Sequence, residues 1–269
     1  MPADPPADPG SPPRLGLALS GGAVRGAAHV GVLEVLTEAG IVPEVVAGTS
    51  AGAIVGAAYA AGIGPTPLAE ILASTKWSEV ARVNLRRTMS IFDTMPMERF
   101  VEERLGAEDF AELERPFAAV ACDVTTGERI VLCEGRVGVA VRASAAVPGL
   151  FPPVEIDDRL LVDGGLVDSV PVQAARDLGA TFVIAVDLNP RDPLPRPTSI
   201  RELVMAAAVI RARATPRVGD PPDFTIHPEV GDLRPWDLDE VEAFIDRGRA
   251  AAEAALDDVQ TALRERSLL

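Results

Sequence analysis

The sequence predicts an α/β fold: a single three-layer domain with a mainly parallel central sheet flanked by helices. First, strand-like and helix-like segments alternate over the first third of the chain, which favours right-handed parallel crossovers. Second, 48% of the residues are hydrophobic but only 4% are aromatic, so the core must be aliphatic. Third, a chain of 269 residues can bury such a core without disulfides or metals.

Short aliphatic runs that end in turn residues predict strands, and apolar residues spaced three or four apart predict helices. The first half should contain a strand at 15–19, a helix at 25–39, a strand at 45–47, a helix at 53–61, helical segments at 67–74 and 97–105, and a hairpin of 117–124 with 129–133. The second half should contain a helix at 137–146, a strand at 160–162, a helix at 172–178, a strand at 181–187, a helix at 199–213, a strand at 224–226 and a helix at 237–266.

Glycine and proline set several of these boundaries. Gly40 and Gly179 follow helical segments, at the position where helices commonly end. The prolines of residues 189–197 remove backbone donors and predict a surface loop. We find no internal repeat and no linker after residue 14, so residues 14–269 are expected to form one domain.

Residues 1–13 are rich in proline and have neither an apolar run nor a positively charged start. They are typical of a disordered tail and not of a secretory signal. No later stretch reaches the ~18 consecutive apolar residues of a membrane span. We therefore expect a cytoplasmic protein that is at most peripheral at the membrane.

Acidic residues outnumber basic ones by 40 to 25, giving a formal charge of −15. Because nucleic-acid binding depends on Lys and Arg neutralising phosphates, we expect no nucleic-acid partner. Cys122 and Cys133 lack the spacing of a zinc site and are expected to be buried free thiols. Neither a metal nor an organic cofactor is indicated.

The segment Gly48-Thr49-Ser50-Ala51-Gly52 joins a predicted strand to a predicted helix. A serine at such a turn projects from the carboxyl end of the sheet, beside helix N–H groups that favour developing negative charge. Ser50 is therefore a candidate nucleophile, and the supporting residues of the turn are Gly48, Ala51 and Gly52. The alternative is a chance match to the pattern.

A second glycine-rich turn, residues 20–26, follows the first strand. Its backbone N–H groups could bind a phosphate or the oxyanion of a transition state. The glycine spacing does not match the dinucleotide-binding fingerprint, and a Gly-Lys-Ser/Thr sequence is absent. Beside a candidate nucleophile an oxyanion hole is the better interpretation, and a simple tight turn is the alternative. The expected donors are Gly21, Gly22 and Ala23.

Arg25 and Gly26 complete this turn. Two roles are open for Arg25. It could brace the loop through backbone carbonyls or a carboxylate, or it could simply lie on the surface.

Asp163-Gly164-Gly165 ends a predicted strand. In a parallel sheet this would put the Asp163 carboxylate at the edge that carries Ser50, although Asp-Gly is also a common turn. The usual base for a nucleophilic serine is histidine, and the chain has only His29 and His227. His29 falls among packed residues of a predicted helix and His227 ends a short strand, so neither is placed as a base.

Four segments resemble, in the same order, motifs of the patatin-like phospholipase family in its bacterial branch. They are LALSGGAVRGAAHVGVLEVL (17–36), VVAGTSAGAIVGAAYA (45–60), VRASAAVPGLFPPV (141–154) and LLVDGGLVDSVPV (160–172). The resemblance spans about residues 14–190. The remaining C-terminal residues carry no such motif and are expected to cover the site or set substrate choice.

The resemblance implies a patatin-like fold and a Ser–Asp dyad that works without histidine. Ser50 would be the nucleophile, Asp163 the base and residues 21–26 the oxyanion loop. The family usually has a third glycine where this chain has Ala23. If that position needs a positive φ, the Cβ of alanine costs about 1–2 kcal/mol.

The resemblance also implies a serine acyl hydrolase of lipid carboxylic esters, of the lipase, phospholipase A or lysophospholipase type, that forms an acyl-enzyme. The expected partner is a phospholipid, lysophospholipid or acylglycerol. The sequence leaves open whether the enzyme meets this lipid through transient contact with a membrane surface. The sequence carries no signal for an oligomeric state.

Two alternatives remain. One is an α/β-hydrolase-type esterase with a Ser–Asp–His triad that ends in His227, but only two strand-like runs precede Ser50. The other is an inactive member that binds lipid or a protein partner, which intact Ser50 and Asp163 disfavour.

Overall fold

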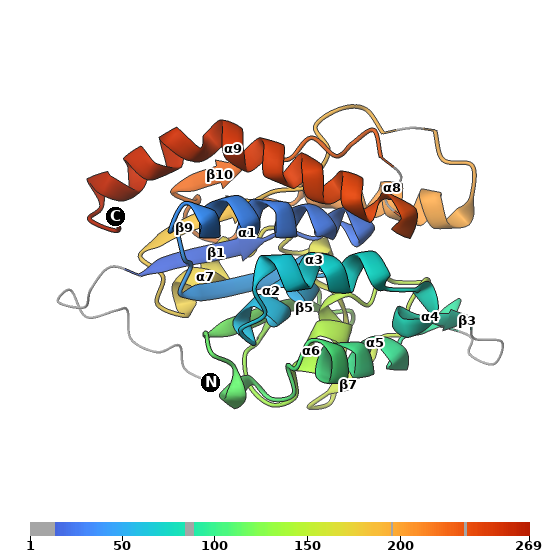
Figure 1. Cartoon of the computed structure of the whole chain (residues 1–269). Helices are drawn as coiled ribbons and strands as arrows, with labels where there is room; N and C mark the ends of the chain where they lie inside the picture. Colours follow the sequence, from blue (N-terminus) through green and yellow to red (C-terminus); the bar gives the residue numbers. More distant parts are fainter. Residues whose placement is uncertain (1–13, 84–88, 195, 234–235) are drawn as a thin grey trace.

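The computed structural model of the chain describes residues 14–83, 89–194, 196–233 and 236–269, so the tail predicted at 1–13 lies outside the described residues. Its centre is an eight-stranded sheet of order β10-β9-β1-β2-β5-β8-β7, with β6 paired to β5 off this path (Figure 1). The strands of this sheet are β1 (Leu15–Leu19), β2 (Val45–Thr49), β5 (Phe117–Asp123), β6 (Arg129–Leu132), β7 (Val154–Ile156), β8 (Arg159–Asp163), β9 (Phe182–Val186) and β10 (Phe224–Ile226).

Helices lie on both faces of this sheet. The α-helices are α1 (Ala28–Glu38), α2 (Ala51–Ala60), α3 (Pro65–Ser74), α4 (Trp77–Val80), α5 (Met95–Arg99), α6 (Val137–Ser144), α7 (Val172–Asp177), α8 (Ile200–Ala214) and α9 (Val241–Glu265). Shorter helical turns are η1 (Ala23–Ala27), η2 (Phe100–Arg104), η3 (Phe110–Glu112), η4 (Gly164–Leu166) and η5 (Leu238–Glu240). A separate two-stranded hairpin consists of β3 (Arg82–Val83) and β4 (Phe92–Asp93).

Two apolar clusters on opposite faces of the sheet give the domain three layers. On one face Leu17, Leu19 and Val46 pack with α1, α2 and α9, and Figure 1 shows α9 running along α1. On the other face Ala18 and Val45 pack against α7. Successive residues of a strand point to opposite faces, so β1 and β2 contribute to both clusters. The predicted three-layer α/β fold is confirmed.

The direction of the strands changes at β5. Strands β10, β9, β1, β2 and β5 pair in parallel, whereas β8 runs antiparallel to β5. β6 occupies one edge of β5, and β2 occupies the other edge as far as Val120. β8 takes over that second edge at Ala121, the partner of Asp163, directly after Val120, the partner of Thr49. The carboxyl ends of β2 and β8 therefore meet end to end along β5.

Some elements differ from the sequence predictions. β7 was not predicted, and it pairs with β8 across Asp157 and Asp158, whose φ angles are 49° and 61°. This two-residue turn lacks the glycine that usually signals a hairpin. The hairpin of β3 and β4, which was not predicted, lies between the predicted helical segments at 67–74 and 97–105, and the predicted helix at 25–39 begins as η1 before α1.

The two cysteines lie in different environments. Cys122 is buried, as predicted, but Cys133 is exposed, so that part of the prediction is wrong. Among the described residues, none of the helices combines the length and the apolar composition that crossing a bilayer requires.

Candidate active site

Ser50 lies at the sharp turn between β2 and α2, with φ 54° and ψ −118°. Residues other than glycine rarely adopt a positive φ, and such backbone strain is frequent at functional sites. Two glycines let the strand and the helix approach closely. A Cβ on Gly48 would lie 2.3 Å from the Gly52 carbonyl oxygen, and one on Gly52 would lie 2.2 Å from the Leu19 carbonyl oxygen. The predicted strand–turn–helix geometry around Ser50 is therefore present.

A fully buried serine, Ser144 at the end of α6, holds this turn in place. The Ser50 N–H donates to Ser144 Oγ at 2.9 Å, and the Ser144 hydroxyl donates to the Val120 carbonyl at 2.6 Å. Ser144 thus ties the turn to both α6 and β5. The sequence interpretation missed it, because 94 positions separate it from Ser50 and only the fold brings the two together.

A second anchor comes from the segment after η4. The Thr49 hydroxyl donates to the Asp168 carbonyl at 2.9 Å. The Asp168 side chain is buried and forms an ion pair with Arg129 on β6, with 2.7 Å between Oδ2 and Nε. Breaking a buried pair of this kind leaves an uncompensated charge. Because the pair holds Asp168 in place, the Asp168 carbonyl fixes the end of β2 through Thr49.

Asp163 faces Ser50 where β2 and β8 meet. The Gly165 N–H donates to Asp163 Oδ1 at 2.8 Å, and the Ser50 hydroxyl is close enough to the carboxylate to lower its pKa. Asp163 is 6% exposed. Burial nevertheless raises the pKa of Asp163 to about 6, against the opposing effects of Ser50 and the Gly165 N–H. A carboxylate with this pKa is ionised at neutral pH yet remains basic enough to accept a proton.

The proximity of Asp163 to Ser50 has a different cause from the one expected. The sequence interpretation assumed a parallel strand, but β8 is antiparallel to β5. The two residues meet because β8 approaches β2 head-on along the edge of β5. The backbone of Gly164 packs directly against β5, because a Cβ on Gly164 would lie 2.1 Å from the Val120 carbonyl oxygen.

The loop that contains Gly21 runs beside Ser50. A Cβ on Gly21 would lie 3.4 Å from the Ser50 Cβ, but the Gly21 N–H donates to the Ser169 carbonyl at 3.1 Å. Gly21 therefore differs from the prediction, because its N–H is already used within the fold. Among the described residues, the N–H groups of Gly22 and Ala23 have no acceptor. They remain the candidate oxyanion donors of this loop.

Ala23 has φ 54°, so the condition that makes alanine unfavourable at this position is met. Gly26 allows the loop to lie against α2, because a Cβ on Gly26 would be 2.5 Å from the Ala51 Cβ. Gly165 contributes through its N–H, which donates to Asp163 as described above.

Neither histidine lies beside Ser50. His29 is buried in α1, as expected, and its Nε2 donates to the Ser20 carbonyl at 2.9 Å. Burial lowers the pKa of His29 to about 4, so the ring is neutral at pH 7. His227 lines a separate cavity that also includes Asp187 and Arg191.

An apolar cavity of about 180 Å³ lies over Ser50 and Asp163. Its walls come from the two glycine-rich turns, from the segment between α3 and η2, and from the C-terminal region. The larger side chains include Ile54, Phe100, Phe151, Met205, Val209 and Trp236. The C-terminal region that lacks family motifs therefore covers the site, as expected.

Arg25 forms part of this wall and is only 4% exposed, so a surface role is wrong. Its buried Nε has no hydrogen-bond partner, and no ion pair to Arg25 is found among the described residues, so the expected brace is not found there either. Burial, followed by the charge of Arg213, lowers the pKa of Arg25 to about 10, and the side chain stays cationic at pH 7. A second cavity, of about 570 Å³, also includes Arg25 in its wall.

A buried cation without an anion is unfavourable unless a ligand supplies one. Arg25 is therefore a candidate anion-binding residue in the wall of the cavity that contains Ser50. Within the described parts of the chain, no group of three His, Cys, Asp or Glu side chains is placed to hold a metal ion.

A serine on a strained strand–helix turn, close to a buried carboxylate and to unpaired N–H groups, has the groups that nucleophilic catalysis by serine requires. A family model described as patatin-like phospholipase matches residues 17–176, which is more than half of the chain. The chain belongs to the patatin-like phospholipase family, and the resemblance noted from the sequence is confirmed.

Curated relatives extend well beyond the length of this chain. An uncharacterized NTE family protein of Mycobacterium tuberculosis is 32% identical over 282 aligned residues, which cover 90% of this chain and 46% of the relative. Patatin-like phospholipase domain-containing protein 7 of Rattus norvegicus is 30% identical over 187 aligned residues, covering 66% of this chain and 14% of the relative. The chain thus spans about half or less of these relatives.

A solved structure also shares the fold. VipD from Legionella pneumophila superposes with a TM-score of 0.63 at 12% sequence identity, covering 92% of this chain and 67% of that chain. At this identity the likeness establishes the architecture and nothing about substrate.

Proposed function

We propose that the chain is a serine acyl hydrolase that cleaves carboxylic esters of lipids through Ser50 and Asp163. The observation that carries this proposal is the placement of the Ser50 hydroxyl, in one cavity, close to a buried carboxylate whose pKa burial raises to about 6. The apolar cavity above both residues and the family membership support a lipid substrate.

In the first half-reaction, Ser50 Oγ attacks the ester carbonyl carbon while Asp163 takes the hydroxyl proton. The N–H groups of Gly22 and Ala23, with that of Ala51 at the start of α2, stabilise the oxyanion. The C–O bond to the leaving group breaks, Asp163 returns the proton to the leaving alcohol or lysolipid, and an acyl-enzyme remains.

In the second half-reaction, a water attacks the acyl carbon and gives its proton to Asp163. The fatty acid is released, and the Ser50 oxygen recovers the proton from Asp163. The two half-reactions together consume one water per ester bond and leave the enzyme unchanged.

We infer further that the preferred lipid carries a phosphate. Arg25 is a buried cation on the cavity wall, and a phosphate would supply the anion it lacks among the described residues. A neutral acylglycerol would leave Arg25 uncompensated. Phospholipids and lysophospholipids therefore fit the site better than acylglycerols.

The test compares phospholipid, lysophospholipid and acylglycerol hydrolysis by wild type, Ser50→Ala, Arg25→Lys and Arg25→Gln. Ser50→Ala should lose activity on all three lipids, and wild-type rates in that variant would refute the serine assignment. Arg25→Gln should lose at least about tenfold on the phosphate-bearing lipids only, with partial retention in Arg25→Lys. An equal loss on acylglycerol would refute the phosphate assignment.

A non-hydrolytic lipid-binding protein is the second candidate, and Ala23 at φ 54° is the observation that motivates it. A strained oxyanion loop could bind an ester without stabilising its transition state. A fluorophosphonate probe separates the two candidates, because only an activated serine reacts with it. The triad alternative is not retained, since neither histidine lies beside Ser50.

A further inference from the structure

Exposed large hydrophobic side chains gather in two segments of the described chain. Eleven such residues are exposed, and eight of them belong to residues 77–95 or to α8. We call these eight the rim patch: Trp77, Val83, Met89, Ile91, Met95, Ile200, Leu203 and Ile210. Soluble proteins rarely gather apolar side chains in this way unless the surface binds something.

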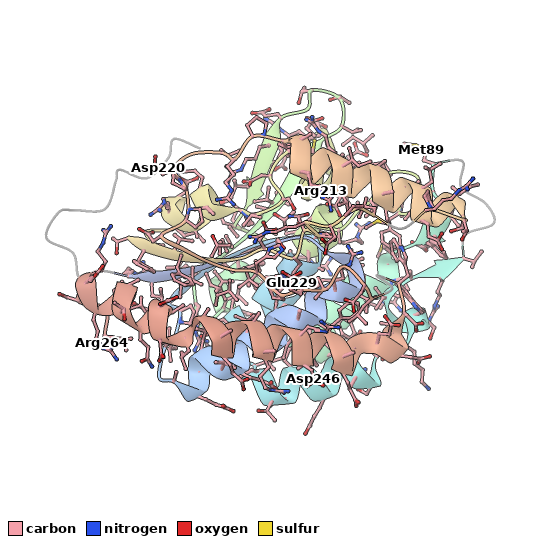
Figure 2. All side chains as sticks on the ribbon, turned by 90° about the horizontal axis from the view of Figure 1, so that it is seen from above. Met89, Arg213, Asp220, Glu229, Asp246 and Arg264 are labelled. Carbon is pink, nitrogen blue, oxygen red and sulfur yellow. The ribbon has the colours of Figure 1, made fainter. Side chains whose placement is uncertain are left out.

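The two segments of the rim patch lie at the same end of the molecule. Val204 and Met205 of α8 pack in one apolar cluster with Ala81, which precedes β3, and with Phe92 of β4. Figure 1 shows α8, α4 and β3 at this end, and Figure 2 shows Met89 at the same end as the first turns of α8 in a perpendicular view.

The rim patch is continuous with the cavity over Ser50. Trp77 belongs to both, and α8 is apolar on two faces. Met205 and Val209 line the cavity, whereas Ile200 and Leu203 do not and are exposed. Trp77 therefore joins the exposed apolar surface to the wall of the cavity over Ser50.

Positive charge accompanies the rim patch although the chain as a whole is strongly acidic. Lys76, the only lysine in the sequence, is exposed, as are Arg82 and Arg99. Residues 76–99 carry five basic and three acidic residues. Of the acids, Glu79 pairs with Arg104 at 2.8 Å, Glu98 is buried, and Asp93 is half-buried and accepts from the Met95 N–H. Exposed apolar side chains in a segment with more basic than acidic residues suit the interface of an anionic bilayer.

We propose that the rim patch docks the protein on the surface of an anionic lipid bilayer, so that lipid enters the cavity directly from the membrane. Its identification with substrate entry rests on the proposed function. The docking itself does not, because an enzyme without its nucleophile must still bind the bilayer.

Tryptophan fluorescence reports on the end of the molecule that carries the rim patch, because both tryptophans of the chain line the cavity there. Trp77 and Trp236 both line the cavity, and their ring centroids are 6.2 Å apart. The experiment mixes Ser50→Ala protein with vesicles of phosphatidylcholine containing phosphatidylglycerol. Tryptophan emission should shift to the blue, and acyl chains brominated near the headgroup should quench it. Pure phosphatidylcholine vesicles should bind more weakly.

Matched variants locate the surface. In the Ser50→Ala background, Ile91→Ser with Ile200→Ser and Leu203→Ser should weaken vesicle binding by at least about tenfold. The control, Val42→Ser with Val124→Ser, removes two side chains that are each 47% exposed elsewhere, and binding should change by less than about twofold. With Ser50 restored, both variants should hydrolyse a soluble short-chain ester at wild-type rates.

Several outcomes would overturn the docking proposal: equal vesicle binding by the rim variant and the control, or no binding by any variant. Light scattering that shows a lipid-free dimer dissociated by the rim substitutions would also overturn it, because the patch would then join two copies. Vesicle binding without hydrolysis would leave the docking standing and refute the proposed function. Ester hydrolysis with no vesicle binding would refute the docking proposal and leave the proposed function standing.

Discussion

The dyad region and the rim of the cavity are built in opposite ways. In the dyad region, hydrogen bonds that involve Ser144 and Thr49 hold the backbone of the turn, and one from the Gly165 N–H holds the Asp163 carboxylate. The rim is apolar and half-exposed, and α8 is held to the body partly by a hydrogen bond from Arg211 Nε to the Leu166 carbonyl at 2.9 Å. Chemistry requires polar groups at fixed positions, whereas a surface for lipids requires apolar area and little geometric precision.

This contrast separates the expected effects of substitutions. Changes in the dyad region should lower the rate on every ester, soluble or aggregated. Changes at the rim should affect only aggregated lipid. Within the dyad region, substitutions are expected to differ widely in the size of their effects.

The largest effect is expected for Asp163→Asn. The amide is nearly isosteric but cannot accept the Ser50 proton, so kcat/KM on a soluble ester should fall by at least about a thousandfold. Asp158→Asn, on the exposed turn before β8, is the matched control and should keep wild-type activity. A variant that retained a tenth of the rate would make Asp163 a structural residue.

The same substitution should stabilise the fold at pH 8. Burial raises the folded-state pKa of Asp163 from 3.8 to about 6, so the folded state binds the proton more tightly than the unfolded state. Stability conferred by this group is therefore lost as the pH rises from about 4 to about 6. Deleting the charge should restore about 1–3 kcal/mol at pH 8, measured by urea denaturation. A destabilised Asn variant would contradict a desolvated carboxylate.

A smaller effect follows from the pH dependence of the wild type. Because Asp163 must be ionised to act as a base, kcat/KM should fall about tenfold per pH unit below a midpoint near pH 6. A soluble ester and a pH range over which the protein stays folded are required. An acid limb near pH 4 would mean that the base is an unburied carboxylate.

Ser144→Ala should weaken the dyad region without touching its reacting groups. It leaves the buried Ser50 N–H and Val120 carbonyl without their partner, which should destabilise the protein by about 1–3 kcal/mol. Loss of position at the turn should lower kcat by about 10- to 100-fold with little change in KM. Ser74→Ala, which removes an exposed hydroxyl bonded to a carbonyl, is the control. Unchanged kcat in Ser144→Ala would contradict a positioning role.

The smallest effect is expected for Ala23→Gly. Removing the Cβ at φ 54° should raise stability by up to about 1 kcal/mol and the rate by a few-fold at most. Thermal unfolding and kcat/KM on a soluble ester measure both. A clear loss of stability would show that the alanine methyl contributes packing that outweighs the strain.

The parts that the sequence could predict share local causes. The strand–turn–helix around Ser50 and the aliphatic strands depend on neighbouring residues, and so does the buried position of His29 in α1. Asp163 could be predicted because the Asp-Gly-Gly turn after a strand is visible in the local sequence. The assumption that a parallel strand brings it to Ser50 was wrong. Direction and register of β8 depend on pairing with β5, which no local pattern specifies.

What could not be predicted depends on distant contacts. Ser144 has an unremarkable helical neighbourhood, and the Gly21 N–H is taken by Ser169, far along the chain. The burial of Arg25 without a described partner required the C-terminal region to fold over it. The rim patch could not be identified either, because it joins two segments that approach only in space.

The pairing of Ser50 with Asp163 is tested most directly by the site and rate of fluorophosphonate labelling, followed by peptide mass spectrometry. The adduct should form on Ser50, and Asp163→Asn should slow its formation by at least about a hundredfold while the protein stays folded. An adduct on any other residue, or equally fast labelling of Ser50 without the carboxylate, would contradict the account.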